Sequence, residues 1–245
     1  MTDTTSAHRV FFPAAALFAA LAVPIWSLSF LGHGGAVLNQ TSIWHGHEMV
    51  FGFALAVVTG FLLTKVPVPA LATLLLIWLL ARAAAVSTGL PWQADVVLQL
   101  TYPAVLAALA VRPFLKSART VRNLAFVPIV AGFSLAELVY QLEQAGVIDG
   151  GGARGLVLGA DLIACLMFMM GGRITAAATS GAIQNQGERL RSPAHVTLER
   201  YGLMALIVMA GGQLAAVPLV AGAGAAVAAA VVCGRLVRWE TWKIM

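Results

Sequence analysis

Two histidines, a glutamate and a methionine lie within five residues in the segment SIWHGHEMVFGF, Ser42–Phe53. Neutral imidazole binds iron, copper and zinc, and the thioether of Met49 adds a soft sulfur ligand. The segment begins a long apolar run, so these groups would lie at one end of a membrane-spanning helix. The pattern favours a metal or haem site that includes His45, His47 and Met49. In the alternative interpretation, both histidines lie in the wet interface and only anchor the helix.

Helical geometry limits how the two imidazoles can be used. On a continuous α-helix, residues i and i+2 lie about 200° apart, so His45 and His47 cannot bind one ion together unless His45 precedes the first turn. In that helix His45 shares a face with Glu48, and His47 turns away toward Phe51. One imidazole would then be a ligand, and the other a partner to a propionate, a carbonyl or a lipid headgroup. His33, in the preceding Gly-rich loop, is a more distant candidate ligand.

Small residues continue the His45 face at Gly52, Ala56 and Gly60. This spacing lets another helix, or a flat cofactor, approach the backbone closely. Helix packing is the predicted use.

Three further ionisable residues, Arg82, Glu137 and Asp161, lie inside apolar runs. Each of the three is predicted to lie roughly 7 to 9 Å below the membrane surface on the side of the Ser42–Phe53 segment, which is the outer side in the orientation given below, close to the depth of Glu48. A charge at the centre of a span costs on the order of 2.5 to 3.5 kcal/mol, so these groups are expected to face one another rather than lipid. Arg82 could neutralise Glu137 or Asp161, or hold a haem propionate or an anionic substrate. A plain salt-bridge network without a ligand is the structural alternative.

The composition is that of a polytopic membrane protein, because 60% of the 245 residues are hydrophobic and 10% are charged. Six apolar segments have the length of one span, and Pro218 with Ala221–Gly224 would divide a longer run, Tyr201–Val237, into two. The predicted fold is an all-α bundle of about eight transmembrane helices in one membrane domain, residues 1–245. A polar loop is predicted from Arg173 to Arg200, and a helical start to it stays open. The six segments are Val10–Leu31, His45–Val66, Ala70–Ser87, Ala94–Val111, Asn123–Leu142 and Gly155–Gly172.

The lysines and arginines outside these spans predict the orientation. If the N-terminus is cytoplasmic, thirteen of them fall on the inner side and only Arg154 on the outer side. Both termini are therefore predicted to be cytoplasmic, with the basic side chains facing anionic lipid headgroups. Nothing in their spacing suggests nucleic acid. The thirteen are Arg9, Lys65, Arg112, Lys116, Arg119, Arg122, Arg173, Arg189, Arg191, Arg200, Arg235, Arg238 and Lys243.

Enzymatic motifs are missing from the sequence, and we predict no catalytic residue. Cys165 and Cys233 lie in separate apolar runs, which argues against a disulfide framework or a cysteine-rich metal site. The GGGARG segment, Gly150–Gly155, lacks the Lys-Ser/Thr of a phosphate-binding loop.

Several segments resemble the NnrS family, integral membrane proteins associated with bacterial denitrification and nitric oxide stress. The most specific is WHGHEMVFGF…TGFLLT, Trp44–Thr64, supported by RVFFP from Arg9, VRNLAF from Val121, MGGRI from Met170 and RWETW from Arg238. The chain departs from the family pattern at KVPVPAL, Lys65–Leu71, and at ITAAATSGAI after Arg173. Typical members are also longer, with further C-terminal helices that include a His-bearing segment.

The resemblance implies a haem- and copper-binding protein of the bacterial inner membrane. His45 and His47 would be the candidate ligands, with His33 more distant, and Glu48 and Arg82 would tune or anchor the site. The missing helices would come from a second membrane subunit, unless the chain is a short member or a truncated one.

Two other functions stay open on the sequence. One is a transporter of protons or a small anion through the layer of Glu48, Arg82, Glu137 and Asp161, although the inner halves of the spans hold almost no ionisable residue to continue a relay. The other is a non-catalytic assembly or sensor subunit, in a homo-oligomer or with a larger partner.

Overall fold

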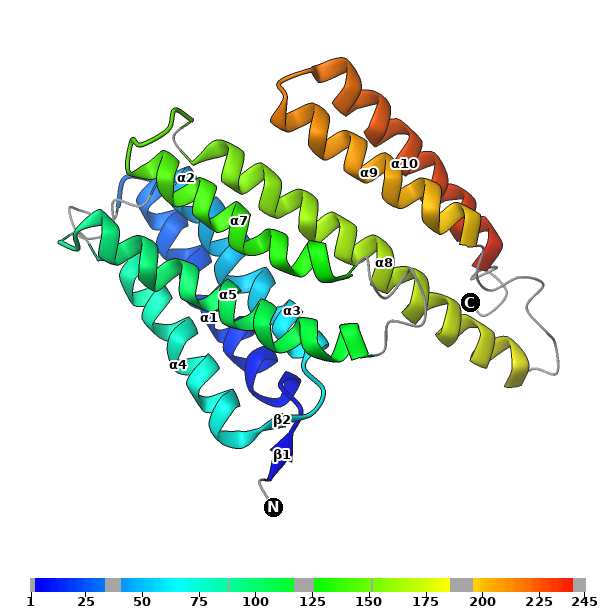
Figure 1. Cartoon of the computed structure of the whole chain (residues 1–245), viewed down its shortest axis with the longest axis horizontal. Helices are drawn as coiled ribbons and strands as arrows, with labels where there is room; N and C mark the ends of the chain where they lie inside the picture. Colours follow the sequence, from blue (N-terminus) through cyan, green and yellow to red (C-terminus); the bar gives the residue numbers. More distant parts are fainter. Residues whose placement is uncertain are drawn as a thin grey trace. The chain divides into compact units, whose positions relative to one another are not determined.

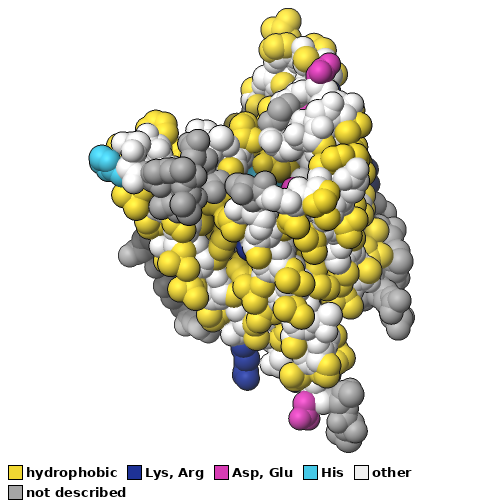
Figure 2. Space-filling model, turned by 90° about the vertical axis from the view of Figure 1, so that its left-hand side faces the viewer, with side chains coloured by type: hydrophobic (Ala, Val, Ile, Leu, Met, Phe, Trp, Pro, Cys, Tyr) yellow, Lys and Arg dark blue, Asp and Glu magenta, His cyan; other side chains and the backbone are white. Residues whose placement is uncertain are grey.

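The described residues form eight long helical segments, seven of which are long and apolar enough to cross a membrane. This computed structural model describes residues 3–33, 41–87, 89–116, 126–150, 152–185 and 196–239. Large apolar side chains point outward along the helices, and Figure 2 shows a largely hydrophobic face with few acidic or basic side chains. A surface of this kind is stable against lipid and not against water. The predicted all-α polytopic membrane fold is confirmed.

The helix bounds lie within a few residues of the predicted spans over most of the chain. The segment α2–η1–α3 is one continuous helix from Ser42 to Leu62, interrupted by the π-helical turns of η1. The exception is α9, which is not among the seven helices that are long and apolar enough to cross a membrane. The elements in order are β1 (Thr4–Thr5), α1 (His8–Phe30), α2 (Ser42–His47), η1 (Glu48–Ala54), α3 (Leu55–Leu62), β2 (Val66–Pro67), α4 (Val68–Ala85), α5 (Trp92–Lys116), α7 (Phe126–Gln144), α8 (Ala153–Asn185), α9 (Val196–Leu214) and α10 (Pro218–Trp239).

Two boundaries of the predicted helices are set by the structure. The polar connection after Arg173 starts as helix, which the prediction allowed, and α8 continues to Asn185. The break in the last apolar run lies at Ala215–Val217, where Ala216 has a φ of 54°, and Ala221–Gly224 lies inside α10. Proline is compatible with the first turn of a helix, so Pro218 begins α10 rather than interrupting it.

The chain divides into two compact units, Met1–Ala160 and Asp161–Met245. The single domain and the cytoplasmic termini stay predictions. Of the predicted inner cations, Arg119, Arg122, Arg189, Arg191 and Lys243 lie outside the described residues.

In unit 1, residues 1–160, α1 packs against the α2–η1–α3 helix, α4 against α5, and α5 against α7 (Figure 1). The small residues predicted to serve helix packing lie on the α1 side of that helix. A Cβ at Gly52 would lie 2.8 Å from Phe18 Cε1, and one at Gly60 would lie 2.5 Å from Phe12 Cε1. These glycines let the rings of α1 lie directly on the backbone of η1 and α3, which confirms the packing interpretation.

In unit 2, residues 161–245, α9 and α10 form an antiparallel hairpin (Figure 1). Two glycines allow the backbones to touch. A Cβ at Gly212 would lie 2.5 Å from Ala221 N, and one at Gly224 would lie 2.6 Å from Met209 N.

We predict that Gly60→Ala lowers the stability of the protein. The added methyl group would overlap the Phe12 ring, and overpacking of this kind costs about 1 to 3 kcal/mol. The measurement is thermal unfolding in detergent. Gly211→Ala is the matched control, because a Cβ there meets no atom within 4 Å; equal melting temperatures for the two variants would contradict the described contact.

Candidate functional site

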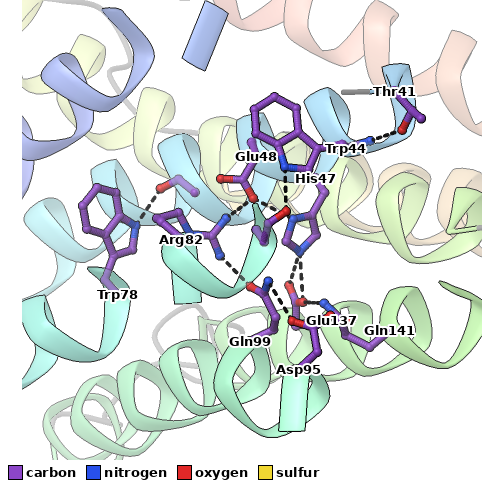
Figure 3. A network of polar contacts seen from close by, with 12 residues as sticks. Thr41, Trp44, His47, Glu48, Trp78, Arg82, Asp95, Gln99, Glu137 and Gln141 are labelled. Carbon is purple, nitrogen blue, oxygen red and sulfur yellow. Dashed lines mark hydrogen bonds and ion pairs between the residues drawn. The ribbon is translucent and has the colours of Figure 1, made fainter. Parts of the chain in front are cut away.

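His47 lies at the centre of a network of polar side chains inside unit 1 (Figure 3). Its Nδ1 is 2.9 Å from Glu48 Oε1, and its Nε2 is 3.0 Å from Oε1 and 3.1 Å from Oε2 of Glu137. Gln141 donates a hydrogen bond of 2.7 Å to Glu137 Oε1 from the next turn of α7. Tyr140 stacks on the imidazole with ring centroids 4.2 Å apart. His47 and Glu137 are 1% and 0% exposed, so the imidazole at the end of α2 contacts α7 out of reach of solvent.

Arg82 of α4 neutralises Glu48 from the other side. Its Nη1 donates to Glu48 Oε1 across 2.5 Å, and its Nη2 donates to Gln99 Oε1 of α5 across 3.0 Å. Gln99 in turn donates to Asp95 across 3.4 Å. Four helices therefore meet in one set of contacts. We call this set the His47 cluster: His47, Glu48, Arg82, Gln99, Glu137 and Gln141.

The geometry of the cluster requires one proton more than a neutral imidazole supplies. A neutral imidazole has one N–H group and one nitrogen lone pair. Both nitrogens of His47 face carboxylate oxygens. Either the imidazole carries two N–H protons, or one carboxylate is protonated. In either state the charges of the imidazole, Arg82, Glu48 and Glu137 sum to zero, which lowers the cost of burying the cluster.

The π-helical turns of η1 help to form the cluster. Leu55 N–H donates to Val50 O, five residues earlier, in place of the α-helical partner four residues earlier. The carbonyl of Gly52 accepts a hydrogen bond of 3.0 Å from Trp78 Nε1 of α4. A Cβ at Gly52 would lie 3.1 Å from Arg82 Nη1. Gly52 thus gives the guanidinium room beside the helix, and its carbonyl fixes α4 in register with η1.

His45 lies apart from this cluster. Its ring stacks on Trp26 of α1, with centroids 4.1 Å apart and planes 16° apart. Its Nδ1 is shielded from solvent and has no hydrogen-bond partner in the part of the chain that the structure describes. Met49, one turn further along the same helix, is half-buried. His45 is therefore an imidazole with an unused nitrogen, whereas both nitrogens of His47 are bound.

Part of the predicted polar layer lies within unit 1. There Glu48, Arg82 and Glu137 meet around His47, as expected of buried charges, and Arg82 pairs with Glu48 rather than with Glu137. Asp161 belongs to unit 2, where Gln213 lies 3.5 Å from its Oδ1.

The local prediction for the histidines also needs correction. His47 contacts Phe51, as predicted, but it does not turn away from Glu48. The prediction assumed a uniform α-helix, whereas the helix changes to π geometry at Glu48. His33 lies exposed three residues beyond the end of α1. Among the described residues, no three His, Cys, Asp or Glu side chains are placed to hold one metal ion.

The sequence interpretation missed Gln99, Gln141 and Asp95. The spacing held a signal for them, because Gln99 is four residues after Asp95 and Gln141 is four residues after Glu137. Residues four apart face the same side of a helix, so an amide at that spacing inside an apolar run indicates a partner for a buried carboxylate.

Comparison with known proteins gives one family match. The model of the family described as "NnrS protein" matches residues 4–245, essentially the whole chain. No curated protein and no solved structure matches the chain.

We predict strong coupling between Arg82 and Glu48. Removing one partner leaves a buried charge without its counter-ion, which costs about 3 to 5 kcal/mol. Arg82→Met and Glu48→Gln should each destabilise the protein by that amount, and the double variant should lose clearly less than the sum. The measurement is a double-mutant cycle of unfolding free energies in detergent.

The control for this cycle is Arg154→Met. Arg154 lies 3.6 Å from Glu143, but its side chain is 54% exposed, and the buried Glu143 carboxylate also accepts hydrogen bonds from the backbone N–H groups of Arg154 and Gly155, which this variant keeps. The loss of stability in Arg154→Met should therefore be clearly smaller than the loss in Arg82→Met. Additive losses at Arg82 and Glu48 would show that the pair is not coupled.

Proposed function

Because the chain belongs to the NnrS family, we propose that it binds haem, copper or both in the membrane and protects the cell against nitric oxide and nitrosative stress. The resemblance of the Trp44–Thr64 segment implies both groups. The observation that supports the proposal in this chain is the unused, solvent-shielded Nδ1 of His45. A buried polar atom without a partner is costly, and such atoms commonly mark a functional role.

The two histidines of the Trp44–Thr64 segment differ in whether a ring nitrogen is free to bind a metal. His45 offers a ring nitrogen that no described group occupies, and the stack on Trp26 fixes its ring plane. His47 does not fit in its described position, since a metal at either nitrogen would have to displace Glu48 or Glu137. We therefore assign His45 as the ligand to haem iron or to copper, with Met49 as a candidate second donor.

The His47 cluster would serve this site by holding the helix that carries His45 in place. It ties the helix that carries His45 to α4, α5 and α7 through His47, Glu48 and Arg82. Residues that hold a ligand-bearing element in place are needed for a defined metal geometry. His47, Glu48 and Arg82 are thus positioning residues in this proposal. A bound haem or copper centre would supply the affinity for nitric oxide and the redox chemistry, and this chain would supply the imidazole and a site shielded from water.

The setting of the protein follows from the same proposal. Seven apolar helices require a lipid bilayer, and we place them in the bacterial inner membrane. Further donors would come from His33 or from a second copy or a second membrane subunit.

Proton-coupled transport is the second candidate, because the His47 cluster holds one more proton than a neutral imidazole supplies. Deeper in unit 1, the Thr59 and Tyr102 hydroxyls share a hydrogen bond of 2.7 Å and are fully buried. Glu137→Gln should abolish a substrate-dependent proton flux in proteoliposomes if the cluster is a relay. Equal flux in that variant and in the parent protein would exclude this candidate.

We predict that the purified full chain shows a haem Soret band or stoichiometric copper. His45→Ala should lose most of that signal, because it removes the imidazole nitrogen that we assign as the ligand. The measurements are an optical spectrum and a metal analysis of protein purified in detergent.

His8→Ala is the matched control, since His8 is a histidine of α1 that lies against Phe12, whereas His45 stacks on Trp26 near the other end of α1. Its spectrum and metal content should equal those of the parent. Folded parent protein that is colourless and metal-free after expression with haem precursor and copper would overturn the proposal, as would His45→Ala with undiminished metal.

A further inference from the structure

An apolar groove runs along α10 inside unit 2, away from the His47 cluster. It has a volume of about 470 Å³ and is lined by residues of α8, α9 and α10, among them Met167, Phe168, Leu206, Ala228 and Val232. Its lining on α10 extends from Ala225 to Trp239, which is roughly 21 Å at 1.5 Å per residue. Met167 and Val232 are 70% and 40% exposed, so the groove is open along its side.

One cation, Arg235, is built into the wall of this groove. It is 6% exposed, its Nη1 donates to Phe168 O across 3.0 Å, and its guanidinium lies 4.2 Å from the centroid of the Phe168 ring. The guanidinium also lies 5.1 Å from the centroid of the Trp239 ring. The guanidinium of Arg235 occupies the place where a Cβ on Gly172 would lie. Any other residue at position 172 would therefore displace the guanidinium. The surrounding residues are therefore shaped to hold a guanidinium at this place.

More positive charge gathers at the same end of unit 2. Arg173 follows Gly172, and the antiparallel hairpin brings the start of α9, with Arg200, to the end of α10, with Arg238. Glu199 is the one acidic side chain that the described residues of this end contribute. Four arginines against one glutamate give this end of the groove a positive potential, which favours an anionic group.

We propose that this groove binds one phospholipid with an anionic headgroup. An acyl chain lies along the apolar wall between α8 and α10, and the phosphate lies at the arginine end. Apolar channels with basic residues between transmembrane helices have the chemistry that anionic lipids require. The positive charge argues for a lipid over a helix of a second copy, because the apolar part of this groove would suit either. The proposal is independent of haem or copper binding.

The test is native mass spectrometry of the full chain in detergent with equal amounts of a phosphatidylglycerol and a phosphatidylcholine of the same acyl chains. The parent protein should retain one phosphatidylglycerol in preference to phosphatidylcholine. Arg235→Gln should lower that occupancy about fivefold, because one cation near an anionic headgroup contributes about 1 kcal/mol to binding. Arg154→Gln, an exposed arginine of unit 1, should leave it unchanged.

A second variant, Ala229→Phe, fills the groove and leaves Arg235 and its contacts in place. It should lower retention of the phosphatidylglycerol even if Arg235→Gln fails to fold. Equal retention of the two lipids by the parent protein would overturn the proposal. Unchanged retention of the phosphatidylglycerol by Ala229→Phe would also overturn it. A parent protein that is a dimer without bound lipid, and that Ala229→Phe converts to a monomer, would overturn it as well.

Discussion

The structure of unit 1 depends on one constraint, the high cost of an unbalanced charge inside a hydrocarbon environment. Glu48, Glu137 and Arg82 come from three different helices, and none of them can reach water. Their charges are balanced only when η1, α4 and α7 stand at the register that brings them to His47. Helix packing in a membrane gains little from the hydrophobic effect. The polar contacts therefore select one arrangement among the many that apolar surfaces alone would allow.

Hydropathy was sufficient to predict the helices, because the length of an apolar run is set by the thickness of the bilayer. It failed where another interaction sets the boundary. The polar residues after Arg173 continue α8, since a helix that has left the hydrocarbon need not end there. Pro218 was read as a break, whereas the turn lies just before it at Ala216. The π geometry of η1 changes which carbonyl each N–H group binds, and that change leaves no trace in composition.

The candidate site was predictable to the extent that charge identifies it. Counting ionisable residues at a common depth correctly grouped Glu48, Arg82 and Glu137. The count could not choose which carboxylate pairs with Arg82, because that depends on helix rotation, and it overlooked neutral amides such as Gln99. Helical geometry separated His45 from His47 but did not say which of them is the ligand. The structure separates them by their neighbours, since one stacks on an indole and the other is held between two carboxylates.

The wide turns of η1 also bear on how this segment tolerates changes in length. A helix widens in this way when it fits one extra residue between two points that packing has already fixed. Here those points are the His47 contacts on one side and the Thr59–Tyr102 hydrogen bond on the other. Loss of a single residue between Glu48 and Ala54 would let the segment close as ordinary α-helix with both ends still facing their partners. The same loss within α4 would rotate half of that helix by about 100° and carry Arg82 or Trp78 out of contact.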